Sequence, residues 1–228
     1  MEIEILKKYK IDYKIKYSKR KTIGIHFSSY NELVIACPNR TKDEEIIRVI
    51  DKHINWILEH RETKAKPFNE IADGVKYELL GKEYIIRICQ NKHEKVERVD
   101  DTIYIYVNNI SQASKKFKEY CYELCDFVYS ELLDKAYHEI IEIRKKYPHL
   151  IVKESKRNWG YCRVNEGVIM INLSLIRADK ELIEYVIYHE LCHLVFPNHS
   201  KEFHGLLSKY IPDEKQRRKK LSRYPIIW

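Results

Sequence analysis

The feature that most constrains this chain is the segment YHELCHLVFPNHSKEFH, residues 188–204, which holds four of the ten histidines. The residues before it repeat apolar side chains at helical spacing behind Asp179, a good N-cap, and predict a helix over about 179–195. At 3.6 residues per turn, one stripe of this helix carries Leu182, Val186, His189 and His193. The two histidines therefore extend an apolar face that must be buried along much of its length.

A single histidine on such a face is most often a hydrogen-bonded core residue. Two histidines one turn apart, with a glutamate directly after the first, form the HExxH pattern, in which both imidazoles reach one tetrahedral Zn²⁺. Glu190 is displaced around the helix from the stripe of His189 and His193. It is therefore predicted to hold and deprotonate a water at the metal rather than to be a ligand.

A catalytic zinc site needs a third protein ligand and one open position. Pro197 cannot continue the helix, and Asn198 tolerates the left-handed conformation, so the chain is predicted to turn back and present His199. His199 follows His189 by ten residues, the spacing of the metzincin pattern, although Phe196 replaces the glycine of that pattern. The rival third ligand is His204, for which a contact to the ligands or to the substrate is the preferred interpretation.

Composition sets the broad class. The 228 residues are 44% hydrophobic, which is enough for a core, and the formal charge is +8. That moderate surplus permits an anionic partner without requiring one. The start of the chain shows no signal peptide, and no stretch approaches the roughly 18 apolar residues of a membrane span. We therefore expect a cytoplasmic location, no membrane partner and six reduced cysteines, with Cys121 and Cys125 packed in the core.

The overall pattern predicts an α+β fold. Residues 1–110 form a β-rich region with one helix near 41–61, opened by a capping box of Thr41 and Glu44. Two hairpins are predicted there, turning at Gly81 and at Asp100 and Asp101. Residues 111–228 are predicted to contain a long helical stretch, two short strands in LIVKES and GVIMINLSL, and the histidine helix. The second of these strands is expected at a sheet edge, beside the histidine helix.

At this point the chain resembles a known family, the YgjP-like or WLM-related zinc metallopeptidases, relatives of the SprT-like proteases. The resemblance covers nearly the whole chain and is most specific in RNWGYC, IMINLSLI, YVIYHELCHL, NHSKEF and YIPDEKQRRKKL. It implies a zincin-like core, in which the HExxH helix lies beside a small mixed sheet. It also implies one zinc ion on His189, His193 and His199, with Glu190 as the catalytic acid and base. Two departures are Tyr161, where the family usually has serine, and His204, where it commonly has tryptophan.

The function expected from the motif and the resemblance is hydrolysis of peptide bonds in a polypeptide substrate. Candidate donors to the developing oxyanion are His204, Tyr210 and Tyr161, and Asn198 is a further candidate contact. Two alternatives remain open. Members of the family have been linked to UTP pyrophosphohydrolysis, and a nucleotide would suit KRK at 19–21 and the basic segment KQRRKKLSR, with Arg217 and Arg218 as candidate anion-binding residues. The other is a DNA-associated, SprT-like protease; either reading would be favoured by a basic groove at the metal.

Overall fold

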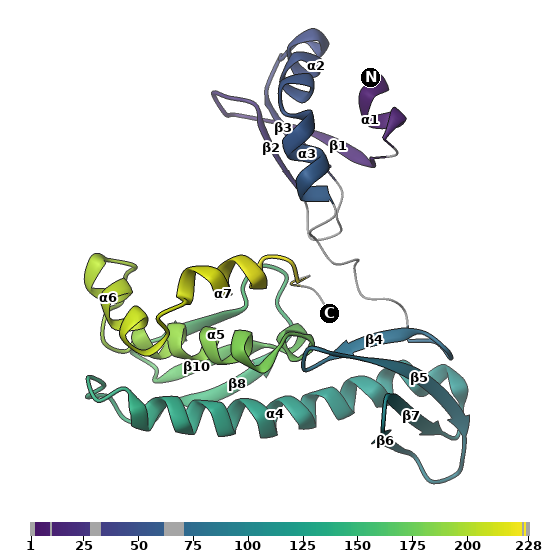
Figure 1. Ribbon diagram of the computed structural model, residues 1–228, viewed down its shortest axis with the longest axis vertical. Helices are drawn as coiled ribbons and strands as arrows, with labels where there is room; N and C mark the ends of the chain where they lie inside the picture. Colours follow the sequence, from purple (N-terminus) through teal and green to yellow (C-terminus); the bar gives the residue numbers. More distant parts are fainter. Residues whose placement is uncertain (1–2, 10, 28–32, 62–70, 225, 227–228) are drawn as a thin grey trace. The chain divides into compact units, whose positions relative to one another are not determined.

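The computed structural model describes residues 3–9, 11–27, 33–61, 71–224 and 226. It is α+β with small mixed sheets (Figure 1) and divides into two compact units, Met1–Pro67 and Phe68–Trp228. Among the described helices, none combines the length and the apolar character that a membrane crossing requires.

The first unit is a three-stranded sheet with helices. In chain order its elements are α1 (Glu4–Lys8), β1 (Tyr13–Ser18), β2 (Gly24–Phe27), β3 (Leu33–Pro38), α2 (Asp43–Lys52) and α3 (Ile54–Arg61). Strand β3 is central, parallel to β1 and antiparallel to β2. Alternate residues of β3, Leu33 and Ile35, share the core of this unit with Ile46, Ile50 and Ile57 of the two longer helices.

The helix predicted over 41–61 is two helices, because the backbone leaves helical geometry at His53 (φ −108°, ψ 12°). His53 and the two residues before it are exposed, so no core packing holds that turn in regular geometry. The predicted capping by Thr41 is wrong. Lys42 is the N-cap, and the Thr41 hydroxyl instead donates to the carbonyl of Pro38 at 2.8 Å.

The second unit opens with a four-stranded sheet made of the two predicted hairpins. Its strands are β4 (Lys76–Leu79), β5 (Lys82–Gln90), β6 (Lys95–Val99) and β7 (Thr102–Val107), in the order β4-β5-β7-β6. Both hairpins are antiparallel, as predicted. Gly81 and Asp100 have positive φ at the turns (75° and 52°), a conformation that glycine and aspartate tolerate better than most residues.

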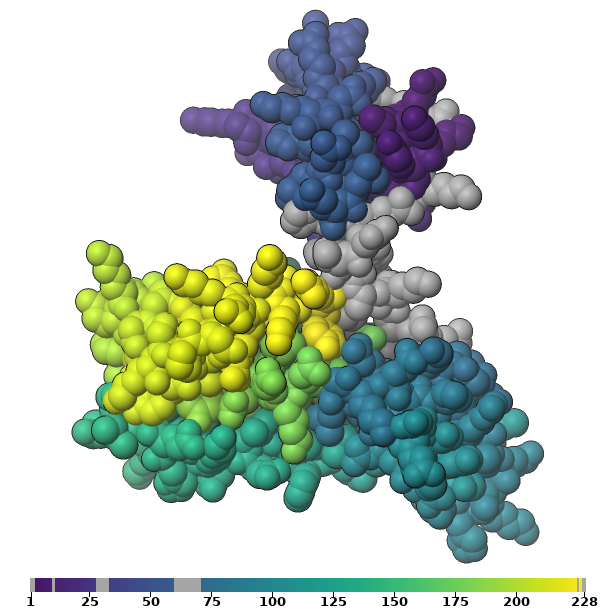
Figure 2. All heavy atoms as spheres, viewed as in Figure 1, coloured from purple at the N-terminus to yellow at the C-terminus, as the bar shows by residue number. Residues whose placement is uncertain are grey.

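The second unit also contains several helices, which pack around α5. They are η1 (Ile110–Gln112), α4 (Ala113–Glu139), η2 (Leu173–Arg177), α5 (Lys180–Cys192), α6 (Lys201–Tyr210) and α7 (Glu214–Leu221). Helix α5 contacts α4, α6 and α7. Figure 1 shows α5 between the long α4 and the yellow α7, and Figure 2 shows α6 and α7 on the outer side of this group. Most of α5 is therefore buried, as its sequence predicted.

A small mixed sheet, β8 (His149–Lys153), β9 (Gly160–Arg163) and β10 (Val168–Asn172), lies against α5. The strand order is β8-β10-β9, with β8 parallel and β9 antiparallel to β10. The prediction that β10 is an edge strand is therefore wrong. It is the central strand, because the segment before it forms the additional strand β9 and covers its free side.

The four-stranded sheet shares one core with the helices that follow it. Tyr77 of β4 packs edge-to-face on Phe117 of α4, with ring centroids 4.8 Å apart. Ile86 and Ile103 belong to the same buried cluster as Leu182 of α5. This shared core explains why the boundary between the two compact units falls after Pro67. The sequence pattern instead predicted one region for all residues up to 110.

The cysteines are all free, and Cys121 and Cys125 are fully buried on α4. Burial raises the pKa of the Cys125 thiol to about 12. Both are therefore packing residues in the folded chain, as their helical spacing predicted.

Candidate metal centre

Helix α5 delivers two of the three histidines. Its residues Leu182 and Val186 are buried, and His189 and His193 continue that stripe to the C-terminal end of the helix. The regular helix ends at Cys192, and His193 is its C-cap in right-handed helical geometry. The end comes earlier than predicted because the next residues close into tighter turns, with the amides of Leu194 and Val195 donating to the carbonyls of Leu191 and Cys192, three residues before each.

The chain then reverses and brings His199 back to the helix. Pro197 and Asn198 are exposed in the turn, as the sequence predicted. The nearest nitrogens of His189, His193 and His199 all lie within 4.8 Å of one another, and Nε2 of His199 is 2.9 Å from Nε2 of His189. These three imidazoles are the only group of His, Cys, Asp and Glu in the described residues that could hold a metal ion in this way.

The electrostatics favour neutral imidazoles, the form that binds metals. Burial, helped by the neighbouring histidines and Arg218, lowers the pKa of His189 to about 3. Burial also lowers the pKa of His193, although its hydrogen bond to the Phe196 carbonyl opposes the shift. That bond joins Nδ1 of His193 to the carbonyl oxygen at 3.1 Å and leaves Nε2 for the centre of the group.

Phe203 organises the three rings and was not singled out from the sequence. Its side chain is fully buried, and its ring centroid lies 4.9, 4.6 and 4.9 Å from those of His189, His193 and His199. The hydroxyl of Ser200, the N-cap of α6, accepts a hydrogen bond from the Phe203 amide at 3.4 Å. A serine N-cap followed three residues later by an apolar side chain was the available signal.

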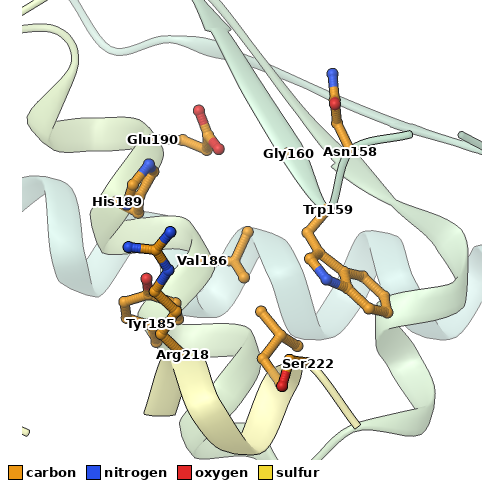
Figure 3. Close-up of a pocket in the computed structure, with 10 residues that line it drawn as sticks. Asn158, Trp159, Gly160, Tyr185, Val186, His189, Glu190, Arg218 and Ser222 are labelled. Carbon is orange, nitrogen blue, oxygen red and sulfur yellow. The ribbon is translucent and has the colours of Figure 1, made fainter. Parts of the chain in front are cut away.

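Glu190 is buried beside this group, with 6% of its surface exposed. Burial raises the pKa of its carboxyl to about 8. The backbone of Gly160, the first residue of β9, lies so close that a Cβ there would approach Oε1 of Glu190 to 2.8 Å. Figure 3 shows Glu190 and His189 side by side at one end of a cavity. The carboxylate is thus beside the imidazoles without belonging to the group that could hold the metal.

The cavity has a volume of about 350 Å³ and lies between α5, α7 and the start of β9. Tyr185 and Arg218 form one side near His189, and Trp159 lies across from them (Figure 3). The remaining lining residues are Asn158, Gly160, Val186, Glu190, Leu221 and Ser222. The contributions of Asn158, Trp159 and Gly160 were missed, because only the pairing of β9 with β10 brings that segment to α5.

A buried asparagine supports that side of the cavity. The Nδ2 group of Asn172, at the end of β10, donates to the carbonyls of Ser155, Asn158 and Ile226 at 2.9, 3.0 and 2.9 Å. The hydroxyl of Ser174 donates to the same Ile226 carbonyl at 2.8 Å. One amide group thus ties the loop before β9 to the segment that follows α7.

The remaining predicted contacts have other surroundings. Nδ1 of His204 lies 3.3 Å from a carboxylate oxygen of the buried Glu214, and its ring centroid is 6.3 Å from that of His199. The Tyr210 hydroxyl donates to Glu142 at 2.7 Å, outside the cavity. His204 is thus near the metal centre, whereas Tyr210 belongs to a separate hydrogen-bonded contact.

Tyr161 lies on the opposite face of β9 from the cavity. Cys162 packs against the hydrophobic cluster that contains the buried residues of α5, and Gly160, two residues earlier on the strand, lies against Glu190. Successive strand residues point to opposite faces, so Tyr161 points away. Its ring is covered by Lys153 and Arg163, with cation-to-centroid distances of 5.2 and 5.3 Å.

The two candidate anion-binding arginines have different surroundings. Arg217 donates to Glu184 and Asp213 at 2.9 Å each and to the carbonyl of Glu181 at 3.0 Å. Arg218 instead lines the cavity. The structure therefore brings Arg218, and not Arg217, to the cavity beside His189.

The donor set fits a metal ion. Three imidazoles converge, and among the described residues no fourth His, Cys, Asp or Glu completes the set. Three protein ligands with one open position are the arrangement of catalytic rather than structural zinc sites.

The chain matches one family model, the YgjP-like metallopeptidase domain, over residues 21–224. No curated protein matches it significantly. The match spans both compact units and includes the three histidines, Glu190 and every residue that lines the cavity. The chain therefore belongs to the YgjP-like family of metallopeptidase domains.

Proposed function

We propose that this chain is a zinc-dependent peptidase in which His189, His193 and His199 hold the metal and Glu190 is the general base. One observation carries the proposal: three imidazoles converge beside a buried carboxylate at the end of a cavity. That combination provides metal ligands, a proton acceptor and space for a substrate at one place. Zinc, when bound, supplies a Lewis acid that makes water acidic and polarises a carbonyl.

The residues of the chain then have distinct roles. Glu190 accepts a proton from the attacking water and later donates it to the leaving amine. Burial raises the pKa of the Glu190 carboxyl to about 8, and the charge of a bound zinc ion would lower it, so the two effects oppose each other at the proton acceptor. His204 is a candidate donor to the developing oxyanion, because it lies beside His199, whereas Tyr161 and Tyr210 have partners elsewhere.

Strand β9 is the candidate edge for an extended substrate. Among the described strands it pairs with β10 alone, so its other edge has backbone groups available for strand addition. Its first residue, Gly160, lines the cavity beside Glu190. A peptide added there would run past the proposed metal site.

The test is metal analysis combined with turnover of two substrate sets by the same zinc-loaded preparation. We expect close to one zinc per chain, removed by chelator, and hydrolysis of denatured polypeptide that follows the metal content. The four nucleoside triphosphates form the second set. Hydrolysis of a triphosphate without any peptide cleavage would contradict the proposal and support the alternative of nucleotide hydrolysis.

The nucleotide alternative has one observation in its favour, the presence of Arg218 in the cavity. The basic segment supplies fewer free cations than its sequence suggests. Arg217 is paired with Glu184 and Asp213, and Nζ of Lys220 lies 3.9 Å from a Glu181 carboxylate oxygen. Association with DNA rests on the related protease group and on net charge alone, so peptide hydrolysis is the better-supported proposal.

A further inference from the structure

Arg218 is a cation that faces the proposed metal site. It lines the cavity together with Tyr185, His189 and Glu190. Figure 3 shows its guanidinium beside His189 and Tyr185, with the indole of Trp159 across the cavity. Among the described residues, no carboxylate oxygen lies within 4.0 Å of this guanidinium, in contrast to the neighbouring Arg217. Its five N–H donors are therefore open to a group that enters the cavity.

Two carboxylates near Arg218, one on the same helix and one in the same cavity, are directed elsewhere. Glu214 lies one turn before Arg218 on α7, where an i,i+4 pair could form, but its carboxylate is beside Nδ1 of His204 at 3.3 Å. Glu190 is buried at the β9 side of the cavity, against Gly160. In the part of the chain that the structure describes, the guanidinium is thus left without a neutralising carboxylate at the place where a substrate would lie.

We propose that Arg218 is a specificity-determining residue that binds a carboxylate of the substrate. This inference rests on the proposed function, because it takes the substrate to be a polypeptide. Guanidinium groups bind carboxylates through paired hydrogen bonds, and substrate that fills the cavity displaces water and strengthens them. Trp159 and Tyr185 provide aromatic walls for the methylene groups of an acidic side chain.

The spacing along α5 suits such a substrate. Tyr185, next to Arg218 in Figure 3, precedes His189 by four residues, about 6 Å along a helix. At about 3.3 Å per residue of an extended peptide, a carboxylate at Arg218 would thus lie within about two residues of the bond that is cleaved. Two sources satisfy this geometry: the side chain of an aspartate or glutamate near that bond, and the free C-terminus of a peptide cleaved near its end.

The experiment compares wild type, Arg218→Gln and Lys219→Gln. Lys219 is exposed on the same helix and does not line the cavity, so its variant removes one positive charge elsewhere. Substrates are paired peptides that differ in one group: glutamate against glutamine at each position around the cleaved bond, and a free against an amidated C-terminus. The first pair tests the side-chain source and the second tests the terminal source.

We expect wild type to prefer one carboxylate-containing peptide by about fivefold or more in kcat/KM, the upper range for an accessible ion pair. Lys219→Gln should keep that preference, and Arg218→Gln should lose it. Arg218→Glu should favour the glutamine or amidated peptide. Equal kcat/KM values within every pair for wild type, or an unchanged preference in Arg218→Gln, would overturn the proposal while leaving the peptidase function intact.

Binding separates this inference from the proposed function. The affinities of the same peptides are measured by calorimetry on the Glu190→Gln background, with and without Arg218→Gln. If no peptide is hydrolysed by wild type, the peptidase proposal falls. A carboxylate preference in binding that disappears with Arg218→Gln would still support the carboxylate site, whereas equal binding or no binding would overturn it.

Discussion

The backbone of Gly160 lies against the side chain of Glu190, and a Cβ on that glycine would stand 2.8 Å from Oε1 and 2.9 Å from Cγ. Any other residue at this position must displace the carboxylate. Because β9 is anchored to β10 on one side and Glu190 is fixed in α5, the glycine limits where the Glu190 carboxylate can lie beside the imidazoles.

Gly160→Ala should therefore reduce turnover by about tenfold or more while zinc content stays near that of wild type, because a displacement of about 1 Å in a catalytic group costs up to two orders of magnitude. Steady-state kinetics and metal analysis on the same preparation measure both. Gly205→Ala is the matched control, since nothing lies within 4 Å of a Cβ at Gly205. Equal turnover of Gly160→Ala and wild type would mean that Glu190 needs no such placement.

Glu190→Gln separates proton transfer from metal binding. The amide keeps the volume of the side chain but cannot accept the proton of water, so turnover should fall by about 10²-fold or more. Zinc content should be unchanged. Glu181→Gln, an exposed change on the same helix, should have wild-type turnover. Loss of zinc in Glu190→Gln would place this residue among the metal ligands, and unchanged turnover would remove its assigned role.

The three histidines should be equivalent in metal analysis. Alanine at His189, His193 or His199 should each reduce zinc below one ion per chain at stoichiometric supply, because two imidazoles do not hold the ion tightly. His204→Ala is the control, since Nδ1 of His204 faces Glu214. Zinc loss in His204→Ala together with full zinc in His199→Ala would reverse the assignment of the third ligand.

Phe203→Ala should lower both stability and zinc affinity. The ring is fully buried, so its removal should cost about 3–5 kcal/mol of unfolding free energy. The three imidazoles that it contacts would gain rotational freedom, so zinc should dissociate at a lower chelator concentration. Phe127→Ala is the control for loss of a ring, because Phe127 is 71% exposed on α4. If folded Phe203→Ala protein bound zinc as tightly as wild type, the ring of Phe203 would contribute to core packing but not to the metal site.

Acid stability should depend on Glu184. Burial raises the pKa of this carboxyl, but hydrogen bonds from Arg217 and Lys135 lower it by more, so it lies below the ordinary value of 4.5. The folded chain therefore binds this proton less readily than the unfolded chain. The stabilisation is complete above about pH 4.5 and is lost as pH falls through the lowered folded value.

Glu184→Gln should consequently destabilise the chain near neutral pH and flatten the loss of stability between about pH 5 and 3. Urea unfolding at a series of pH values measures this difference. Glu166→Gln, which removes an exposed partner of Arg163, is the control. It should leave the loss of unfolding free energy at acid pH the same as in wild type. A parallel pH dependence for Glu184→Gln and wild type would show that the ion pairs with Arg217 and Lys135 do not contribute.

The candidate metal centre could be predicted because its spacing is local. His189 and His193 are one turn apart on one helix, and His199 follows a turn that Pro197 and Asn198 indicate. The two hairpins were predictable for the same reason, from turn residues such as Gly81. The apolar face of α5 was predictable in the same way, because its residues repeat at helical spacing.

Other parts of the site depend on contacts between distant segments. Residues 160–163 lack an alternating pattern and become a strand only by pairing with β10, which is why β10 was taken for an edge. Arg217 and Arg218 are indistinguishable in a run of basic residues until α7 packs on α5. The ring of Phe203 meets three histidines because α6 folds back; the Ser200 N-cap three residues earlier indicates the start of a helix but not which rings that helix meets.

The amide of Asn172 gives the segment after α7 a part in the shape of the cavity. Its two N–H groups are shared among three carbonyls, one in the loop that leads to Trp159 and one at Ile226. A deletion or a bulky extension that pulls Ile226 away would remove one of the three acceptors of this buried amide group, so its donors would then be shared between the carbonyls of Ser155 and Asn158 alone. Changes at Ile226 should therefore alter which substrates the chain prefers, and they should do so before they reduce its metal content.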